Sequence, residues 1–359
     1  MTMVKTEMRA FCNDYAEKLE PFSSTLSSAL GRMPQQHATP LLDQWRLRLQ
    51  EVCHRAETLS DKIGQQHAFL LIFGPLKSGK STLMNAISGA YVSEVSSLPA
   101  YPALVYVRHG EERAFRATTY AGDKIEFESS QAMADKVSHG HEELAQRILE
   151  VERNGEAFDP QRHFPEAIRR MDVETPAEAL AESGSVLVDT PGLYTRMRFG
   201  YDVMTRDFRD TASCAIFVVK SDNLFFEKVF EEFNELLGHF SRIFLVVNID
   251  GSKRDLSADG SLEPSLESRE PQAIVEAFQS LAMSAPLREA YEKGNLNVYP
   301  IDLLESASRR LKSQAGVEQG EDAEVPQNEG FSRFLNDLTE YLNSSDYHRE
   351  FIYDTLRVG

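Results

Sequence analysis

The residues with the clearest chemical role are the eight from Gly74 to Ser81, which read Gly-Pro-Leu-Lys-Ser-Gly-Lys-Ser. They follow the apolar run Ala68 to Phe73, which is typical of a buried strand, and precede Thr82 to Ser88, which has the pattern of a helix. Glycines at both ends let the backbone turn its N–H groups inward, toward phosphate oxygens at the positive end of that helix. The sequence therefore predicts a phosphate-binding loop of the Walker A type.

Each residue of this loop is expected to contact a nucleotide. Lys80 should neutralise the β- and γ-phosphates, and the Ser81 hydroxyl should bind Mg²⁺. A glycine turn without a ligand is the alternative, but the flanking strand and helix argue against it. The remaining residues of the predicted nucleotide-binding segment are Gly74, Pro75, Leu76, Lys77, Ser78, Gly79 and Thr82.

A second element reads Asp189-Thr-Pro-Gly192 and follows the apolar run Ser185 to Val188. It should therefore lie at the carboxyl end of a strand, where ligands bind in open α/β sheets. Asp189 is expected to hold Mg²⁺ through a water molecule, and the Gly192 N–H to meet a γ-phosphate oxygen. An Asp-x-x-Gly sequence alone is also an ordinary turn, but its position after the phosphate loop predicts a nucleotide switch.

A third element, after the apolar run Ile243 to Val247, is expected to select the base. A carboxylate that accepts both N1–H and N2–H of guanine excludes adenine. The usual pattern is Asn/Thr-Lys-x-Asp, and this chain has Asn248-Ile-Asp250. We expect Asn248 and Asp250 to contact the base, because Asn248 ends its strand where the motif should begin. Asp255 of the following loop is the second candidate, and a solvent-facing Asx turn with no role in base recognition is the third.

The composition restricts the possible partners and compartments. The chain has 359 residues, of which 42% are hydrophobic and 26% charged, so it can bury a core in one large or two modest domains. A net charge of −18 argues against nucleic acid as a partner. The three cysteines, Cys12, Cys53 and Cys214, are far apart, which predicts reduced thiols in the cytoplasm. No apolar run approaches the ~18 residues that cross a bilayer.

Alternating strand and helix patterns predict an α/β fold with a mainly parallel, doubly wound sheet. Two polar stretches, Asp250 to Glu270 and Gly316 to Gly330, are expected to be mobile loops. The expected strands are Ala68 to Phe73, Leu104 to Arg108, Ala114 to Tyr120, Ser185 to Asp189, Ala215 to Lys220, Arg242 to Asn248 and Asn297 to Ile301. The expected helices include Ser81 to Ser88, Gln131 to Val151, Tyr201 to Asp210, Glu227 to Leu237 and Pro271 to Leu281.

The segments on either side of this α/β region are expected to pack on each other as helices. The N-terminal one has an apolar seam at steps of three and four, formed by Leu42, Trp45, Leu49, Val52, Ala56, Leu59 and Ile63. We expect Trp45 and Leu49 to be buried against an apolar C-terminal stripe that contains Phe331, Phe334, Leu335, Leu338 and Leu342. An intramolecular bundle is favoured over a dimer seam. The predicted units are 1–66, 67–330 and 331–359.

Together these motifs resemble the GTPase domain of dynamin-like proteins, especially the bacterial and mitofusin-like branch. The resemblance rests on Gly74 to Gly89, Thr175 to Leu180 and Val186 to Leu193, and it extends from about Ala68 to Leu342. It implies a P-loop GTPase domain that binds GTP or GDP with Mg²⁺ and is flanked by a helical neck. It also implies pairing of two copies through their G domains, and a membrane or membrane-associated protein as partner, with a peripheral location.

The chain departs from this family in the segment that should carry the switch I threonine. The corresponding residues, Leu98 to Leu104, contain no threonine, although Ser96 or Ser97 would substitute if the loop slips. We therefore expect slow GTP hydrolysis. A catalytically weak nucleotide-binding scaffold is one alternative, and an ATPase or a nucleotide-promiscuous P-loop protein is the other.

Three further positions differ from the family pattern. Leu76 stands where dynamins have a catalytic glutamine. Lys77 stands where guanylate-binding proteins have an arginine finger, so Lys77 joins Lys80 as a candidate catalytic cation. Ile249 replaces the base-reading lysine, and its apolar side chain is of a kind that could still pack on the purine face. We expect neither a long stalk nor a lipid-inserting paddle within residues 1–359.

Overall fold

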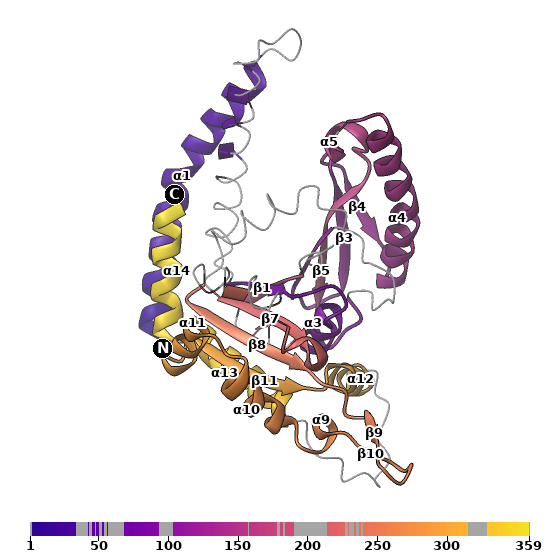
Figure 1. The fold of residues 1–359 in the computed structure, drawn as a ribbon. Helices are drawn as coiled ribbons and strands as arrows, with labels where there is room; N and C mark the ends of the chain where they lie inside the picture. Colours follow the sequence, from indigo (N-terminus) through magenta and orange to yellow (C-terminus); the bar gives the residue numbers. More distant parts are fainter. Residues whose placement is uncertain are drawn as a thin grey trace.

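The structure is a computed structural model, and its described residues form one large sheet with helices on both faces and a helical arm at its side (Figure 1). It describes residues 2–33, 68–92, 103–156, 158–177, 184–189, 214–226, 240–314 and 329–358, with single residues and pairs between 42 and 56, at 180–181, and between 229 and 237. The predicted helix at Tyr201 to Asp210 and most of the polar stretch Gly316 to Gly330 lie outside these residues.

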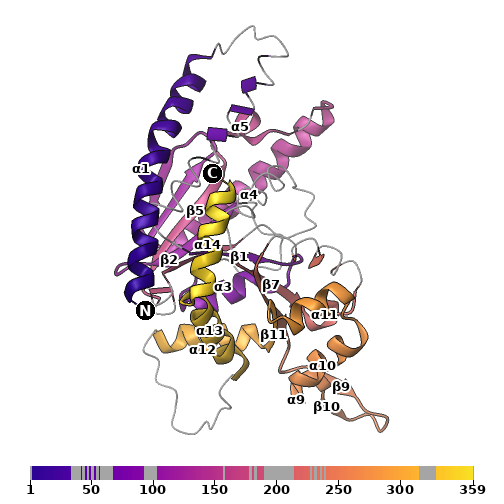
Figure 2. The same ribbon diagram turned by 90° about the vertical axis from the view of Figure 1, so that its left-hand side faces the viewer.

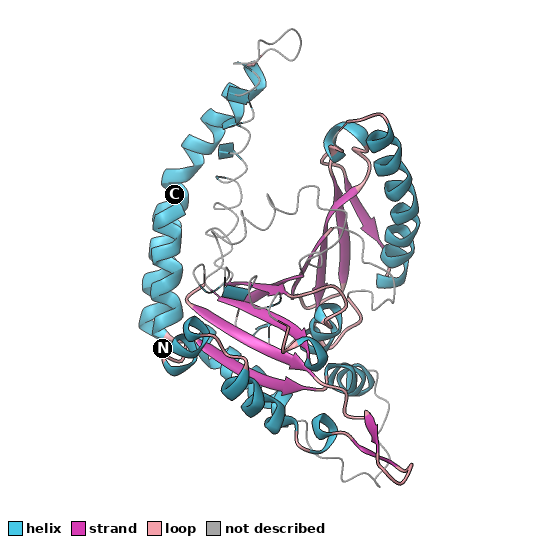
Figure 3. Ribbon diagram, in the orientation of Figure 1, coloured by secondary structure: helices cyan, strands magenta, loops and turns pink. Residues whose placement is uncertain are grey.

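Figure 3 shows the strands of the described part in magenta. Within that part the main sheet has nine strands in the order β11-β8-β7-β1-β6-β2-β5-β3-β4. Neighbours from β11 to β6 run parallel, whereas β2 is antiparallel to β6, and β3 is antiparallel to both β4 and β5. The mainly parallel α/β fold predicted from the sequence is thus confirmed. The bounds are β1 (Ala68–Phe73), β2 (Leu104–His109), β3 (Ala114–Thr119), β4 (Lys124–Phe127), β5 (Ile168–Thr175), β6 (Ser185–Asp189), β7 (Cys214–Lys220), β8 (Arg242–Asn248) and β11 (Leu296–Ile301).

Helices cover both faces of the central strands, which explains why those strands are apolar throughout. Along β1, Leu70 and Ile72 pack with α3 and α13, and Leu71 and Phe73 belong to the core on the other face with α10 and α11. The long helix α4 covers the outer strands β3 and β4 (Figure 1). The bounds are α3 (Lys80–Ser88), α4 (Ser130–Arg153), α5 (Pro160–His163), α10 (Pro271–Leu281), α11 (Ala285–Glu292), α12 (Leu303–Gln314) and α13 (Glu329–Leu342).

The helical arm consists of α1 (Thr2–Arg32) and α14 (Ser345–Val358), which pack side by side (Figure 2). Cys12 of α1 is fully buried in the same core as Phe334 and Phe351, and Phe11 and Tyr15 pack against that core. Segments from the two ends of the chain therefore share one hydrophobic core with the sheet.

The expected burial of Trp45 is wrong. Its side chain is 52% exposed, and the Arg48 guanidinium lies 6.0 Å from the centroid of its ring. Helix α1 already packs on the C-terminal helices, so their apolar stripe is occupied by residues outside the predicted seam. The seam residues Leu59 and Ile63 lie outside the described part of the chain.

The polar stretch from Asp250 to Glu270 is not the mobile loop that we expected. It contains the short antiparallel hairpin β9 (Arg254–Leu256) and β10 (Leu262–Pro264), followed by α9 (Leu266–Arg269). The hairpin turn is closed by Asp259, whose Oδ1 accepts hydrogen bonds from the Ser261 amide (2.9 Å) and hydroxyl (2.7 Å). Side-chain hydrogen bonds of this kind make a polar sequence fold locally.

The contact between α1 and the core can be tested with two phenylalanines on the same helix. Phe→Ala costs about 3–5 kcal/mol at a fully buried site, so the partly buried Phe11→Ala should lower the free energy of unfolding by roughly half of that. Phe22, which is 53% exposed, provides the matched control, and Phe22→Ala should change stability little. Urea unfolding measures both, and equal effects of the two variants would contradict the packing of α1 described above.

Candidate functional site

The phosphate loop leaves β1 at Gly74 and enters α3 at Lys80, and both of its glycines lie in close contact with neighbouring strands. Gly74 has a φ of 147°, and a Cβ there would lie 2.1 Å from the Val218 carbonyl oxygen of β7. Gly79 has a φ of 109°, and a Cβ there would lie 2.6 Å from Nδ2 of Asn248. Only glycine therefore lets the loop approach these neighbours.

Lys80 is buried inside the loop, with 7% of its surface exposed. Its Nζ donates hydrogen bonds to the carbonyl oxygens of Gly74 (3.1 Å) and Pro75 (3.0 Å). Burial lowers the pKa of Lys80, and the nearby carboxylate of Asp189 acts in the opposite direction. The loop thus holds an ammonium group at its centre, where the phosphates of a nucleotide would need a cation.

Ser81 and Asp189 come together although they are far apart in the sequence. The Ser81 hydroxyl donates a hydrogen bond of 3.2 Å to Oδ2 of Asp189, the buried last residue of β6. A hydroxyl and a carboxylate are hard oxygen ligands, which suit Mg²⁺ together with phosphate oxygens and water. The chemistry of these donors therefore fits Mg²⁺. Gly192 lies outside the described residues.

The rest of the loop divides into buried and exposed positions. Pro75 and Ser78 are buried, as is Thr82 on α3, while Leu76 is partly exposed. Lys77 is exposed, has a left-handed φ of 61°, and makes no ion pair within the described part of the chain. A non-glycine residue in this conformation is strained, and such strain is common at functional sites. The ammonium group of Lys77 is thus a positive charge at the surface of the loop.

Two residues of the expected base-reading segment have side chains that contact other residues of the protein. Nδ2 of Asn248 donates a 2.9 Å hydrogen bond to the Ser78 carbonyl oxygen, which ties the end of β8 to the phosphate loop. Ile249 is only 8% exposed and belongs to the core on the α10 and α11 face. Ile249 is therefore not available to pack on the purine face, because core packing has taken up its side chain.

Asp250 is exposed at the carboxyl edge of the sheet. Its Oδ1 accepts hydrogen bonds from the Ser252 amide (2.9 Å) and hydroxyl (2.6 Å), and these bonds, with the nearby Lys253 and Lys220, lower the pKa of the carboxyl group. Because a carboxylate has about four acceptor positions, others remain for a ligand. The alternative, Asp255, lies on β9 in the hairpin that projects from the body of the domain (Figure 1).

Sequence reasoning missed Asp302, the residue after β11. Its Oδ2 accepts a hydrogen bond from the Gly251 amide (2.9 Å), and its Oδ1 accepts one from the Glu305 amide (2.9 Å) in the first turn of α12. Asp302 thus joins the loop after β8 to the start of α12. An aspartate between an apolar strand and a helix is a recognisable N-cap signal, so the helix start could have been predicted, although the contact with Gly251 could not.

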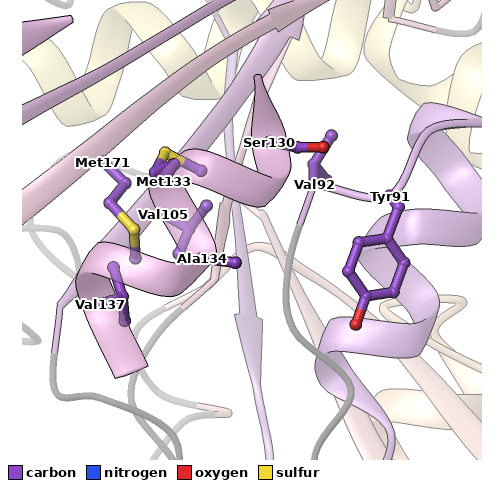
Figure 4. A pocket seen from close by; sticks show the side chains of 8 residues that line it. All are labelled: Tyr91, Val92, Val105, Ser130, Met133, Ala134, Val137 and Met171. Carbon is purple, nitrogen blue, oxygen red and sulfur yellow. The ribbon is translucent and has the colours of Figure 1, made fainter. Parts of the chain in front are cut away.

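A small apolar cavity lies elsewhere, between β2, β5 and the start of α4 (Figure 4). It measures about 40 Å³ and is lined by residues that include Val105, Met133, Val137 and Met171. Sites for small molecules usually enclose about 300–1,000 Å³. This cavity therefore does not hold a nucleotide, and the carboxyl edge around the phosphate loop remains the candidate site.

Comparison with protein families identifies the family to which the domain with this edge belongs. The model of the dynamin family matches residues 70–250, which include the phosphate loop, Asp189, Asn248 and Asp250. The chain belongs to the dynamin family. Its mainly parallel sheet and phosphate loop are accordingly those of a dynamin-type G domain.

Relatives of this dynamin-family chain share modest identity with it. It is 23% identical over 246 residues to the "Uncharacterized protein in xynA 3'region" of Caldicellulosiruptor sp., an alignment that covers 68% of this chain and 51% of the relative. It is 29% identical over 135 residues to "Isoniazid-induced protein IniC" of Mycobacterium tuberculosis, which covers 37% of this chain and 23% of that protein. The chain thus spans about half or less of the relatives that it matches.

A solved structure supports the same fold for this dynamin-family chain. It is described as "An oligomerised bacterial dynamin pair provides a mechanism for the long range sensing and tethering of membranes", and it matches with a TM-score of 0.51 at 14% identity. The match covers 96% of this chain and 46% of the solved one. Within the described residues, none of the helices is both long and apolar enough to span a bilayer.

Proposed function

We propose that this chain binds GTP together with Mg²⁺ at the loop between β1 and α3 and hydrolyses the GTP slowly. The observation that carries the proposal is the buried ammonium of Lys80, which is held by the Gly74 and Pro75 carbonyl oxygens beside the Ser81–Asp189 pair. Phosphoryl transfer depends on positioning and charge neutralisation more than on covalent chemistry, and these groups are of the right kind. Membership in the dynamin family supports the choice of a guanine nucleotide.

In this proposal the individual residues have separate tasks. Backbone N–H groups from Gly74 to Ser81 bind the phosphates, and Lys80 neutralises the β- and γ-phosphates. Ser81 and Asp189 hold Mg²⁺, which when bound would offset the charge that develops on the phosphate oxygens. Asp250 selects guanine, while Gly192 would respond to the γ-phosphate. Isotherms for GTP, GDP and ATP with Mg²⁺ test this function directly, and the absence of GTP binding at micromolar concentrations would contradict it.

We further propose that the nucleotide state changes G-domain pairing or the position of a helical neck that contains α1 and α14, at a membrane or a membrane-associated protein. Packing of α1 on the core shared with α14 supports a neck that flanks a nucleotide-binding domain of about residues 67–330. The solved bacterial dynamin pair is described as tethering membranes, and shared family membership supports a related role here. Measurements of the molecular mass of the protein in solution, with GDP and with a non-hydrolysable GTP analogue, would detect nucleotide-dependent pairing.

A nucleotide-promiscuous site is the second candidate, and burial of Ile249 in the core is the observation that favours it. With Ile249 in the core and Asn248 bonded to the phosphate loop, fewer side chains are left to read the base. Displacement of a bound fluorescent guanine nucleotide by ATP and by GTP measures the two affinities and distinguishes the two candidates. Equal affinities would favour the promiscuous site.

Lys77 offers a test of turnover that leaves product binding intact. If its ammonium acts on charge that develops only in the transition state, Lys77→Ala should lower kcat and change GDP affinity by less than about threefold. The loss of kcat should be smaller than the 10³–10⁵ acceleration of an arginine finger, because an ammonium cannot donate the two parallel hydrogen bonds of a guanidinium. Lys77→Arg is the matched control and should keep or raise kcat. Equal losses of GTP and GDP affinity with unchanged kcat would assign Lys77 to ground-state binding.

A further inference from the structure

Hydrogen bonds from α9, the helix that follows the hairpin, fix the backbone of the segment from Asp250 to Lys253. The Ser268 hydroxyl of α9 is shared between the carbonyl oxygens of Lys253 (2.7 Å) and Asp250 (3.1 Å). The Ser265 amide donates a further bond of 3.0 Å to the Lys253 carbonyl oxygen. Residues that lie about fifteen positions later in the chain therefore fix both ends of this segment.

An ion network continues this support into the neighbouring loop. Glu267 of α9 is only 4% exposed, and its Oε1 lies 2.8 Å from the ammonium of Lys253, while its Oε2 accepts a hydrogen bond from the Ser221 hydroxyl. The same ammonium lies 2.6 Å from Oδ1 of Asp222. Ser221 and Asp222 follow β7, so one buried carboxylate links the loops after β7 and β8.

The buried carboxylate of Glu267 depends on these partners, because an unpaired buried charge is costly. Lys253 keeps 38% of its side chain exposed, so the network joins the two loops without burying both charges. Asp250 itself is exposed, and within the described part of the chain Ser252 alone donates hydrogen bonds to its carboxylate. The position of that carboxylate therefore depends on the backbone that α9 holds.

We propose that α9, through Glu267 and Ser268, positions the Asp250 carboxylate for the guanine base. This inference rests on the proposed function, because it assigns a support to the base-reading residue of the same site. Glu267 and Ser268 are positioning residues, since they act through the segment from Asp250 to Lys253. The short helix after the hairpin thereby contributes to base selection although it lies outside the main sheet.

The inference predicts a specific loss of discrimination between GTP and ITP, whose base lacks the 2-amino group. A well-placed carboxylate accepts two N–H groups from guanine and one from hypoxanthine, so misplacement should remove the advantage of GTP first. The loss of one hydrogen bond to a charged acceptor corresponds to about ten- to a hundredfold in affinity. Affinity for ITP, which depends mainly on the phosphate loop, should change much less.

Displacement of N-methylanthraniloyl-GDP from the full chain by GTP and by ITP, with Mg²⁺, tests this. Ser268→Ala and Glu267→Ala should weaken GTP about tenfold and ITP less than about threefold. Glu267→Gln keeps one acceptor oxygen for Lys253, and its NH2 group can donate to the Ser221 hydroxyl, so it should recover most of the GTP preference. Asp222→Asn removes only the charge of the exposed partner of Lys253 and should leave the ratio of the two affinities near that of the wild type.

The possible outcomes separate this inference from the proposed function. If wild-type protein binds neither nucleotide, the proposed function fails and this inference fails with it. If the wild type prefers GTP but the variants keep that preference, only the role of α9 is overturned. Equal losses for GTP and ITP that follow a fall in melting temperature would likewise overturn positioning, since they indicate a structural role. A GTP-selective loss in Ser268→Ala at an unchanged melting temperature supports it.

Discussion

Lys80→Ala is expected to weaken GTP binding by at least about a hundredfold, because two or more charge-assisted bonds to the phosphates, each worth about 1.5–3 kcal/mol, would be lost. The ammonium is buried in the loop, and no other cation among the described residues lies within hydrogen-bonding distance of the Gly74 and Pro75 carbonyl oxygens that hold it. Without it, the β-phosphate would face those carbonyl oxygens directly. Isothermal titration with GTP and with GDP measures the loss.

The controls for this variant lie in the same loop. Lys80→Met keeps the aliphatic stem and should lose affinity as strongly as Lys80→Ala, which would show that the charge and not the packing is responsible. Lys77→Ala removes an exposed cation three positions earlier and should leave GDP affinity nearly unchanged. A loss of less than about tenfold in Lys80→Ala would refute the assignment of the phosphate site.

Asp250→Asn is expected to weaken GTP by about ten- to a hundredfold, since one of two hydrogen bonds to a charged acceptor is lost. The same change should improve the binding of XTP, because the asparagine amide can donate to the 2-carbonyl oxygen of xanthine while its oxygen accepts N1–H. A reversal of preference is stronger evidence than a loss, because general damage to the site would not produce it. Displacement of a bound fluorescent nucleotide by GTP and by XTP gives both affinities.

Asp255→Asn is the natural control for this reversal. Asp255 lies on β9 of the projecting hairpin and should have no effect on either nucleotide. If Asp255→Asn instead has the larger effect, the base is read from the longer loop, and the assignment of Asp250 is wrong. If neither variant changes the ratio of affinities, base recognition lies elsewhere on the carboxyl edge.

The sequence predicted those parts of the site that depend on local order. The spacing from Gly74 to Ser81 was sufficient to predict the loop, because strand, loop and helix follow one another directly along the chain. Position at the end of an apolar strand was likewise sufficient for Asp189, since parallel strands bring their carboxyl ends to one edge. These are short-range signals, and few alternative folds share them.

Contacts between distant segments could not be predicted in this way. The bond from Asn248 to Ser78 and the one from Asp302 to Gly251 depend on which strands are neighbours, which no local pattern specifies. Strand β5 was missed because its exposed face is charged. Its Glu174 pairs with Arg108 and Arg116 on the adjacent strands, and such partners are visible only after folding.

The reversed direction of β2 determines what lies beside the end of β6. Asp189, the last residue of β6, lies opposite Val105, which is near the beginning of β2. From there β2 continues away from the carboxyl edge of the central strands, bonded along its whole length to β5, which in turn is bonded to β3. A parallel neighbour would instead end at this point and continue as a loop. The end of β6 at Asp189 therefore has a neighbour that stays in the sheet over its full length, and β2 connects this point to the outer strands.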